Sequence, residues 1–357
     1  MILSLGGENE SLAILGERSD QGWRFRLKRN ESALVDRSDE ADRDLSEKFI
    51  PPSRCHAHLR DVLNSLSPAY RMLRPTAANP IFAYPIWSWL MSVSKEVRCS
   101  NWDSWEKLLK QDNPIYRAAS LIKDARKMAL ISGAGLSVDS GVKDFRSASG
   151  WWRNIDPRTV ATVEALESNY DLFHEFYSMR ITRLKDIVPH QGHFILSEWE
   201  KRRMLACVAT QNVDGLHQAA GNQTVYELHG TIRQFRCHAC GAPHTESAFL
   251  RKQKCACGGK LRPNVVLFGE SLPSVAWHRS LNAIKEADLV LVIGTSLQVA
   301  PVNQLPFLTR GHLIFINAEE TGYEDQFDIF IKGRAVDCLV AIEEWLNFFV
   351  GSAAYPK

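Results

Sequence analysis

The pattern of apolar and polar residues changes near residue 115 of the chain. From there on, short runs of consecutive apolar residues are each followed by a glycine-rich or polar turn and then by a helical stretch. The runs cover residues 128–131, 205–209, 289–293 and 313–316. Uninterrupted apolar strands that alternate with helices are typical of a parallel sheet covered on both faces. The pattern therefore predicts an α/β fold with a doubly wound parallel sheet.

The polar first part of the chain has a different pattern of apolar and polar residues. Residues 12–15 and 23–27 are its only strand-like runs, and the turn between them indicates a small hairpin. Leucines spaced along 59–66 indicate an amphipathic helix. No catalytic pattern stands out in this segment. We therefore treat residues 1–114 as a segment of unknown function and fold, and 115–350 as the functional domain.

Composition narrows the possible partners and the location. The 357 residues include 43 Lys+Arg and 41 Asp+Glu, a formal net charge of +2, so no general affinity for nucleic acid or acidic lipid is expected. No apolar run approaches the about 20 residues that cross a bilayer, and the start lacks the cationic lead of a secretory signal. We expect a cytoplasmic protein without membrane contact, in which the eight cysteines are reduced.

Polar turns follow the four apolar runs, and in parallel sheets ligands bind beyond the carboxyl ends of the strands. The first turn includes Gly133, Ala134, Gly135 and Ser137. Glycines after a strand let backbone N–H groups approach a pyrophosphate. The spacing is not that of the dehydrogenase motif, and the phosphate-binding lysine of a P-loop is absent. A nucleotide crevice is the leading hypothesis, with a merely structural turn as the alternative.

The second turn and a nearby histidine carry groups suited to chemistry. Gln211, Asn212 and Asp214 offer amides and a carboxylate to a carboxamide and to ribose hydroxyls, and His229 could take a proton from an alcohol. A histidine before glycine can also be a simple turn or packing residue. We interpret His217, on the helix expected after the turn, as structural.

Four cysteines form two close pairs. Cys237 and Cys240 are separated from Cys255 and Cys257 by 14 residues, a spacing that can supply the tetrahedral four-sulfur shell of a structural zinc ion. Four free thiols are the alternative, and two histidines, His238 and His244, could substitute as ligands. The remaining cysteines read as small buried hydrophobes, namely Cys55, Cys99, Cys207 and Cys338.

The β-prone segment 262–270 ends at a glycine and a glutamate. An unpaired extended segment beside a cleft can accept a peptide by β-strand addition. An ordinary core strand is the alternative for this segment taken alone.

Together these motifs resemble the sirtuin family of NAD-dependent protein deacylases. The ordered set is GAGLSVDSGVKDFR, TQNVDGLH, ELHG, the four cysteines, RPNVVLFGE, GTSLQVAP and IN, and the likeness runs from about Tyr116 to Leu346. The resemblance implies a Rossmann-like domain over 115–350, with a zinc module inserted at about 232–263. The departure is Lys143, where the family usually has proline.

The resemblance also implies roles for individual residues. His229 would be the general base, and Asn212 would be catalytic too. The residues expected to bind NAD are Gly133, Ala134, Gly135, Ser137, Asp144, Phe145, Arg146, Trp152, Gln211, Asn212, Asp214, Gly294, Thr295, Ser296, Asn317, Ala318, Glu319 and Ala335. The residues expected to pair with an acyl-lysine peptide are Val266, Phe268, Gly269 and Glu270. The metal ligands would be the four clustered cysteines, with one structural zinc ion.

A narrower resemblance concerns the acyl group. Ala161, Tyr177 and Arg180 match the positions with which class III sirtuins admit acidic acyl chains. Arginine can bind a carboxylate bidentately, the tyrosine hydroxyl adds a donor, and alanine leaves room. The alternative is that Tyr177 and Arg180 form an ordinary packed and solvated helix face.

The implied reaction transfers an acetyl, succinyl or malonyl group from lysine to ADP-ribose and releases nicotinamide. One alternative is an NAD hydrolase or ADP-ribosyltransferase of the same fold, acting as a defence effector. A second is a non-catalytic nucleotide-binding protein. Whichever function holds, the segment 1–114 could dock a partner or the catalytic domain.

Overall fold

A computed structural model of the chain describes residues 2–7, 10–19, 22–30, 49–50, 113–143 and 155–353. The chain divides into two compact units, Met1–Asn113 and Pro114–Lys357. The first unit contains one antiparallel sheet in the order β1-β2-β3-β4. Its strands are β1 (Ile2–Gly7), β2 (Glu10–Ser19), β3 (Gly22–Asn30) and β4 (Phe49–Ile50).

The hairpin predicted from the polar N-terminal pattern is formed by β2 and β3. The two strands pair antiparallel from Ser11↔Asn30 to Ser19↔Gly22, so the predicted runs 12–15 and 23–27 lie inside them. The helix predicted near 59–66 falls outside the described residues.

A six-stranded sheet forms the centre of the second unit, in the order β13-β12-β11-β5-β6-β7, with every neighbouring pair parallel. Its strands are β5 (Met128–Ser132), β6 (Leu205–Thr210), β7 (Val225–Glu227), β11 (Leu289–Ile293), β12 (His312–Asn317) and β13 (Ile329–Lys332). The four apolar runs of the sequence are the four inner strands. All residues of β5 and β11 are buried, as expected for strands covered on both faces.

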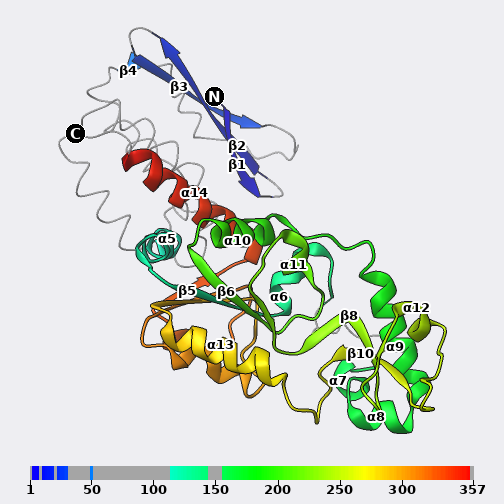
Figure 1. Cartoon of the computed structure of the whole chain (residues 1–357). Helices are drawn as coiled ribbons and strands as arrows, with labels where there is room; N and C mark the ends of the chain where they lie inside the picture. The colour runs from blue at the N-terminus through cyan, green and yellow to red at the C-terminus, as the bar shows by residue number, and fades with distance from the viewer. Residues whose placement is uncertain are drawn as a thin grey trace. The chain divides into compact units, whose positions relative to one another are not determined.

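Helices cover both faces of this sheet (Figure 1). On one face lie α5 (Pro114–Asp124), α10 (Gln191–Lys201) and α14 (Ala335–Ala353), and α14 packs against both of the others. On the other face α13 (Ser274–Glu286) packs with the 3-10 helix η4 (Val302–Leu308) over buried side chains that include Ile131, Val292 and Phe315. Short elements at the strand ends are α6 (Ala134–Ser137), η2 (Val138–Ser140), α11 (Leu216–Ala220) and η5 (Glu324–Gln326).

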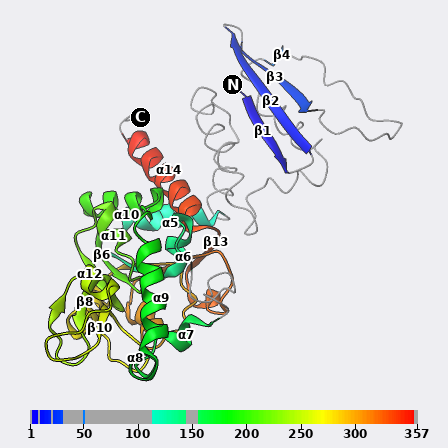
Figure 2. The same cartoon turned by 90° about the vertical axis from the view of Figure 1, so that its right-hand side faces the viewer.

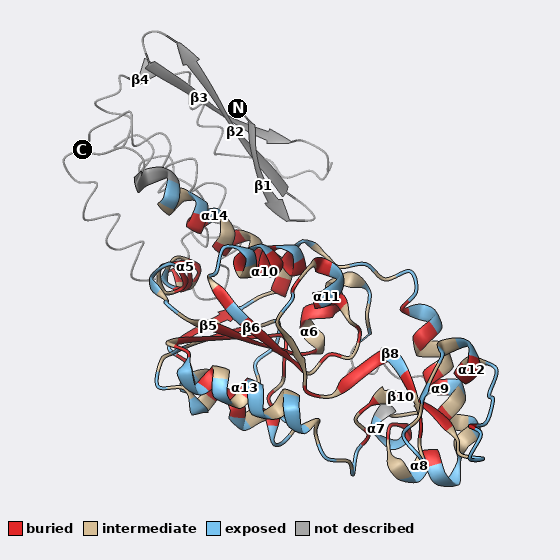
Figure 3. Ribbon diagram, viewed as in Figure 1, coloured by how far each residue is buried: buried red, intermediate tan, exposed pale blue. Residues whose placement is uncertain are grey.

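A smaller subdomain gathers at one end of the second unit, visible in both views (Figures 1 and 2). It consists of α7 (Pro157–Val160), α8 (Val163–Ser168), α9 (Tyr170–Arg183), α12 (Glu246–Leu250), and the sheet β10-β8-β9, with β8 (Gly230–Cys237), β9 (Pro243–His244) and β10 (Leu261–Val265). These elements share a second apolar core, separate from that of the large sheet, which the burial colouring shows (Figure 3). The doubly wound fold with a small inserted module is thus confirmed.

Candidate active site

Two glycine turns at the carboxyl edge of the large sheet lie against each other. The N–H of Gly133 donates to the Ile293 carbonyl at 2.9 Å, and the N–H of Gly135 donates to the Gly294 carbonyl at 2.8 Å. A Cβ added to Gly133 would lie 2.7 Å from the Gly294 oxygen, and one added to Gly135 would lie 2.8 Å from the Gly294 Cα. No side chain fits between the turns. The glycines therefore allow two strand ends to approach at backbone contact.

A buried hydrogen-bond chain joins the first turn to the second. Asn212 Nδ2 donates to the Gly133 carbonyl at 3.0 Å and to Ser137 Oγ at 3.1 Å. Ser137 Oγ donates to Asp214 Oδ2 at 2.7 Å, and Asp214 Oδ1 accepts from the Leu216 N–H at 2.9 Å. Asn212, Asp214 and Ser137 are all buried. Their side chains are thus held in fixed orientations at the strand ends.

Gln211 joins the second turn to the third. Its Nε2 donates to Thr295 Oγ1 at 3.0 Å, and its backbone N–H donates to the Ser132 carbonyl at 2.9 Å. Thr295 is buried and Ser296 half-buried. The three predicted turns therefore form one continuous polar edge.

Further along this edge lie the residues predicted for the adenosine side. Asn317 ends β12, and its Nδ2 donates to the Glu319 carbonyl at 2.7 Å. Ala318 and Glu319 are exposed, and the buried Ala335 begins α14. The predicted cofactor residues Asp144, Phe145, Arg146 and Trp152 lie outside the described residues.

His229 lies between β7 and β8, at the point where the large sheet gives way to the smaller subdomain. Its Nδ1 is 3.1 Å from the Gln211 carbonyl oxygen. Because a carbonyl can only accept, Nδ1 carries the proton and Nε2 keeps its lone pair. Burial holds the pKa of His229 below its usual value, and the hydrogen bond to Gln211 opposes part of that shift. The imidazole is therefore in the form that a general base requires at neutral pH.

The segment predicted to accept a peptide begins beside His229. The N–H of Val266 donates to the His229 carbonyl at 2.8 Å. The strand expected over 262–270 is shorter than predicted, because β10 ends at Val265 and Gly269 turns the chain at a φ of 96°. Phe268 is 49% exposed, and its N–H donates to the Ala161 carbonyl at 2.9 Å.

Glu270 is turned into the protein in this structure. Its carboxylate accepts from Arg262 Nη1 at 2.6 Å, from Arg262 Nη2 at 2.9 Å and from the Leu267 N–H at 2.8 Å. Arg262 is fully buried. The sequence did not reveal that this pair, eight residues apart, holds the shape of the segment from inside.

The three residues predicted to select the acyl group come together next to this segment. Ala161 and Tyr177 are buried in the core of the smaller subdomain, and Arg180 lies one turn along α9 from Tyr177. Burial raises the pKa of Tyr177 to about 12, while the positive charges of Arg180 and Arg262 oppose the shift. Burial lowers the pKa of Arg180, against the influence of Tyr177 and Asp214. Arg180 thus lies within electrostatic reach of both the tyrosine and the polar edge.

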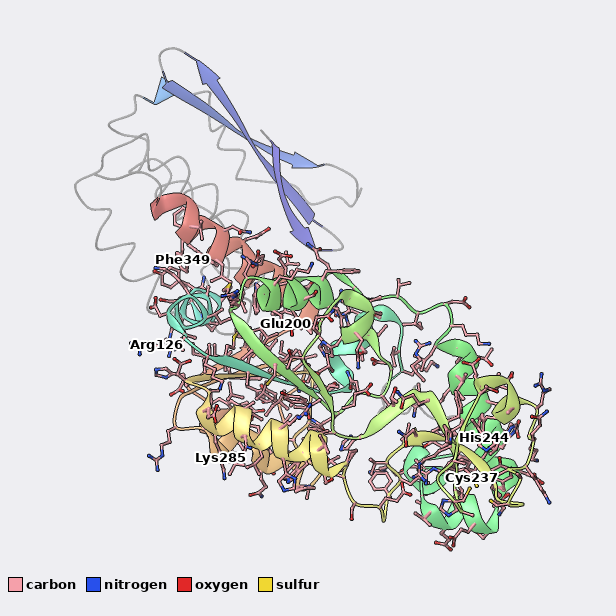
Figure 4. All side chains as sticks on the ribbon, viewed as in Figure 1. Arg126, Glu200, Cys237, His244, Lys285 and Phe349 are labelled. Atoms are coloured by element: carbon pink, nitrogen blue, oxygen red, sulfur yellow. The ribbon has the colours of Figure 1, made fainter. Side chains whose placement is uncertain are left out.

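The four clustered cysteines converge in the smaller subdomain, where Figure 4 labels Cys237. Their sulfurs all lie within 4.8 Å of one another. Cys237 Sγ and Cys257 Sγ are 3.5 Å apart, and Cys240 Sγ and Cys255 Sγ are 3.7 Å apart. A tetrahedral zinc with bonds of ~2.3 Å requires sulfur separations of ~3.8 Å. The residues therefore fit a four-thiolate zinc ion.

A glycine makes room for this cluster. A Cβ on Gly259 would lie 2.5 Å from Cys237 Sγ and 3.2 Å from Cys257 Sγ. His238 and His244 do not belong to the group of potential ligands among the described residues. The cluster is thus complete with four sulfurs, and these leave no open position for catalysis.

Two residues outside the first turn contact it, and the sequence did not predict either contact. His190 Nε2 donates to the Leu136 carbonyl at 2.6 Å, and Arg334 binds Asp139. No local pattern marks either residue. His217, interpreted as structural, is buried with its Nε2 2.9 Å from Ser132 Oγ. Lys143, the departure from the family pattern, is exposed.

Comparison with known proteins agrees with this fold and site. A sequence model of the Sir2 family matches residues 133–301. An NAD-dependent protein deacetylase of Oceanobacillus iheyensis is 39% identical over 220 residues, which are 60% of this chain and 93% of the relative. An NAD-dependent protein deacylase of Thermococcus sibiricus is 38% identical over 241 residues, 64% of this chain and 94% of the relative.

Solved structures give the same result. A Sir2 complex with a p53 peptide and NAD+ matches with a TM-score of 0.61 and 29% identity, over 66% of this chain and 99% of that one. Another, from work on the mechanism and regulation of Sir2 enzymes, matches with a TM-score of 0.61 and 33% identity, over 66% and 98%. The fold and the polar edge define a Rossmann-like enzyme domain with an inserted zinc module. The chain belongs to the Sir2 family, the sirtuins. Among the described residues no helix is long and apolar enough to cross a membrane.

Proposed function

We propose that this protein removes acyl groups from lysine side chains of other proteins in a reaction that consumes NAD. The position of His229 carries the proposal. Its imidazole is fixed on the Gln211 carbonyl, and its own carbonyl binds the Val266 N–H. One base therefore stands between the three polar turns and the segment suited to a peptide. The names of the sirtuin relatives support the same reaction.

Each part of the site has a role in this chemistry. NAD, when bound, supplies the ribose carbon that accepts the acyl oxygen as nicotinamide leaves. Asn212 and Asp214, held by Ser137, orient the carboxamide and ribose hydroxyls. His229 Nε2 takes a proton through those hydroxyls, as general-base catalysis requires. One water is consumed, and lysine, nicotinamide and O-acyl-ADP-ribose are the products.

The other cofactor contacts in the proposal follow the continuous polar edge. Gly133, Ala134 and Gly135 offer backbone groups to the phosphates, together with Gly294, Thr295 and Ser296. Asn317 and the residues after it hold the adenosine. The four cysteines hold a structural zinc ion, which takes no part in the reaction.

The acyl group in the proposal is acidic, of the succinyl or malonyl type. The small side chain of the buried Ala161 lies beside the Phe268 backbone, and the charge of Arg180 acts on Tyr177. A guanidinium and a phenol can together bind a carboxylate. Arg180→Met should therefore lower turnover of a succinyl-lysine peptide at least about tenfold more than turnover of an acetyl-lysine peptide. Equal losses for the two peptides would contradict this role, and Arg183→Met, on the same helix, is the control.

One experiment tests the reaction class. The full chain is incubated with NAD and acetyl-, succinyl- or malonyl-lysine peptides, and nicotinamide and peptide mass are followed. The proposal expects nicotinamide release coupled to loss of the acyl mass. Nicotinamide without a change in the peptide would instead indicate an NAD hydrolase or ADP-ribosyltransferase. No release with any peptide would favour a nucleotide-binding protein whose segment 1–114 docks a partner.

A further inference from the structure

An ion pair joins the first glycine turn to the start of the last helix. Arg334 Nη2 lies 2.8 Å and Arg334 Nε 3.0 Å from Asp139 Oδ1, across 195 positions of sequence. The Asp139 side chain is only 14% exposed, whereas Arg334 is 64% exposed. Arg334 also lies 3.7 Å from Asp337, one turn into α14. Arg334 thus contacts both the first glycine turn and the first turn of α14.

Asp139 occupies the tip of its turn, in η2. The turn closes on itself through the Gly141 N–H, which donates to the Val138 carbonyl at 2.8 Å, and the Val142 N–H, which donates to the Ser137 carbonyl at 3.3 Å. These bonds shape the turn but do not attach it to the rest of the domain. Arg334 supplies such an attachment, because it reaches the tip from outside the turn with a charged hydrogen bond. The orientation of the tip therefore depends in part on Arg334.

Both ends of the ion pair adjoin the proposed cofactor site. Two residues before Asp139, Ser137 holds Asn212 and Asp214. Directly after Arg334, Ala335 begins the helix at the adenosine side. We propose that Asp139 and Arg334 are positioning residues that fix the first cofactor-binding turn against the N-terminus of α14, and so set the affinity for NAD. This inference rests on the proposed binding of NAD at this edge.

The pair acts on binding more than on chemistry. Arg334 makes ion pairs with Asp139 and Asp337, and neither carboxylate is the hydrogen-bond partner of His229, which is the Gln211 carbonyl. An ion pair with one partner largely exposed contributes modestly. We therefore expect about a two- to fivefold rise in the KM and Kd for NAD when the pair is broken, with kcat unchanged.

A double-mutant cycle on the full chain tests the inference. Asp139→Asn, Arg334→Gln and the double variant are compared for the Kd of NAD by titration calorimetry and for KM and kcat. Each single variant should raise the Kd for NAD. The Kd of the double variant should not exceed the higher of the two single-variant values, because both changes remove the same contact. Arg334→Lys, which keeps the charge, should recover part of the affinity.

Arg202→Gln is the matched control. Arg202 makes a 2.7 Å ion pair with Glu343 that also reaches α14 but lies away from the turn. Its removal should leave the Kd for NAD unchanged.

Three results would overturn the inference. The single variants could bind NAD with unchanged affinity, the losses could add up in the double variant, or Arg202→Gln could lose as much affinity as they do. Those results with deacylation intact would leave the proposed function standing. Coupled losses of NAD affinity in a protein that deacylates no peptide would overturn the proposed function alone.

Discussion

The polar edge of the large sheet and the cysteine module are two sites built in opposite ways. The edge collects side chains from turns that lie far apart in sequence, such as Asn212 and Thr295, and holds them by backbone contacts and buried hydrogen bonds. The module collects all four of its ligands from 21 consecutive residues, Cys237 to Cys257. One site is a product of the whole fold, whereas the other needs an ion to complete it. Disturbances of the two sites should therefore have different consequences.

Removing a metal ligand should have the largest effect. Cys255→Ser leaves three thiolates, and a structural zinc site contributes directly to folding. We expect loss of the bound zinc and unfolding of the smaller subdomain at a lower temperature than the large sheet. Metal content by atomic spectroscopy and a thermal unfolding scan measure both.

Cys207→Ala is the control for that change, because Cys207 is buried in β6 outside the cluster. It should keep one zinc ion per chain. A Cys255→Ser protein that retains full zinc and normal unfolding would show that the module does not depend on its ion.

Removing the proposed base should affect the reaction and leave the large sheet and the smaller subdomain folded. His229→Ala should reduce deacylation about a hundred- to ten-thousandfold, with zinc content and unfolding temperature near those of the unchanged protein. Peptide mass after incubation with NAD measures the loss. His278→Ala, an exposed histidine on α13, should retain full activity. Substantial deacylation by His229→Ala would assign the base elsewhere.

The smallest expected effect is a shift in the pH dependence of kcat/KM. Burial lowers the pKa of His229, so its imidazole stays unprotonated further into the acid range than that of a free histidine. The acidic limb of kcat/KM should then lie below the ordinary histidine value of ~6.5, and activity should fall as the pH drops through that limb. A limb above this value would mean that another group, or an opposite shift, governs the step.

The same contrast explains what the sequence could predict. The strand β11 coincides with the predicted run 289–293, because a strand buried on both faces must be apolar throughout. The edge strands β7 and β13 were not predicted, because they are only three and four residues long and partly buried. Short half-buried strands carry too little periodicity to be distinguished from loops.

The two sites also differ in how far a local sequence pattern reveals them. The cysteine module could be predicted because metal spacing is local in sequence and its structure brings the sulfurs together as expected. The inward turn of Glu270 could not, because nothing in RPNVVLFGE shows that its last residue pairs with its first. The contact of Arg334 with Asp139 spans 195 positions and has no sequence signal. Roles assigned by resemblance to the residues of the polar edge stay predictions until the variants are measured.

The backbone contact between Gly133, Gly135 and Gly294 restricts which positions of the domain can be substituted. Any side chain at these three positions would push two strands apart, so the edge tolerates no variation there. The residues proposed to contact the acyl group have no such restriction, because Tyr177 and Arg180 belong to one helix of a subdomain with its own core. Libraries that seek new acyl specificities can therefore vary α9 while the glycine turns keep their geometry.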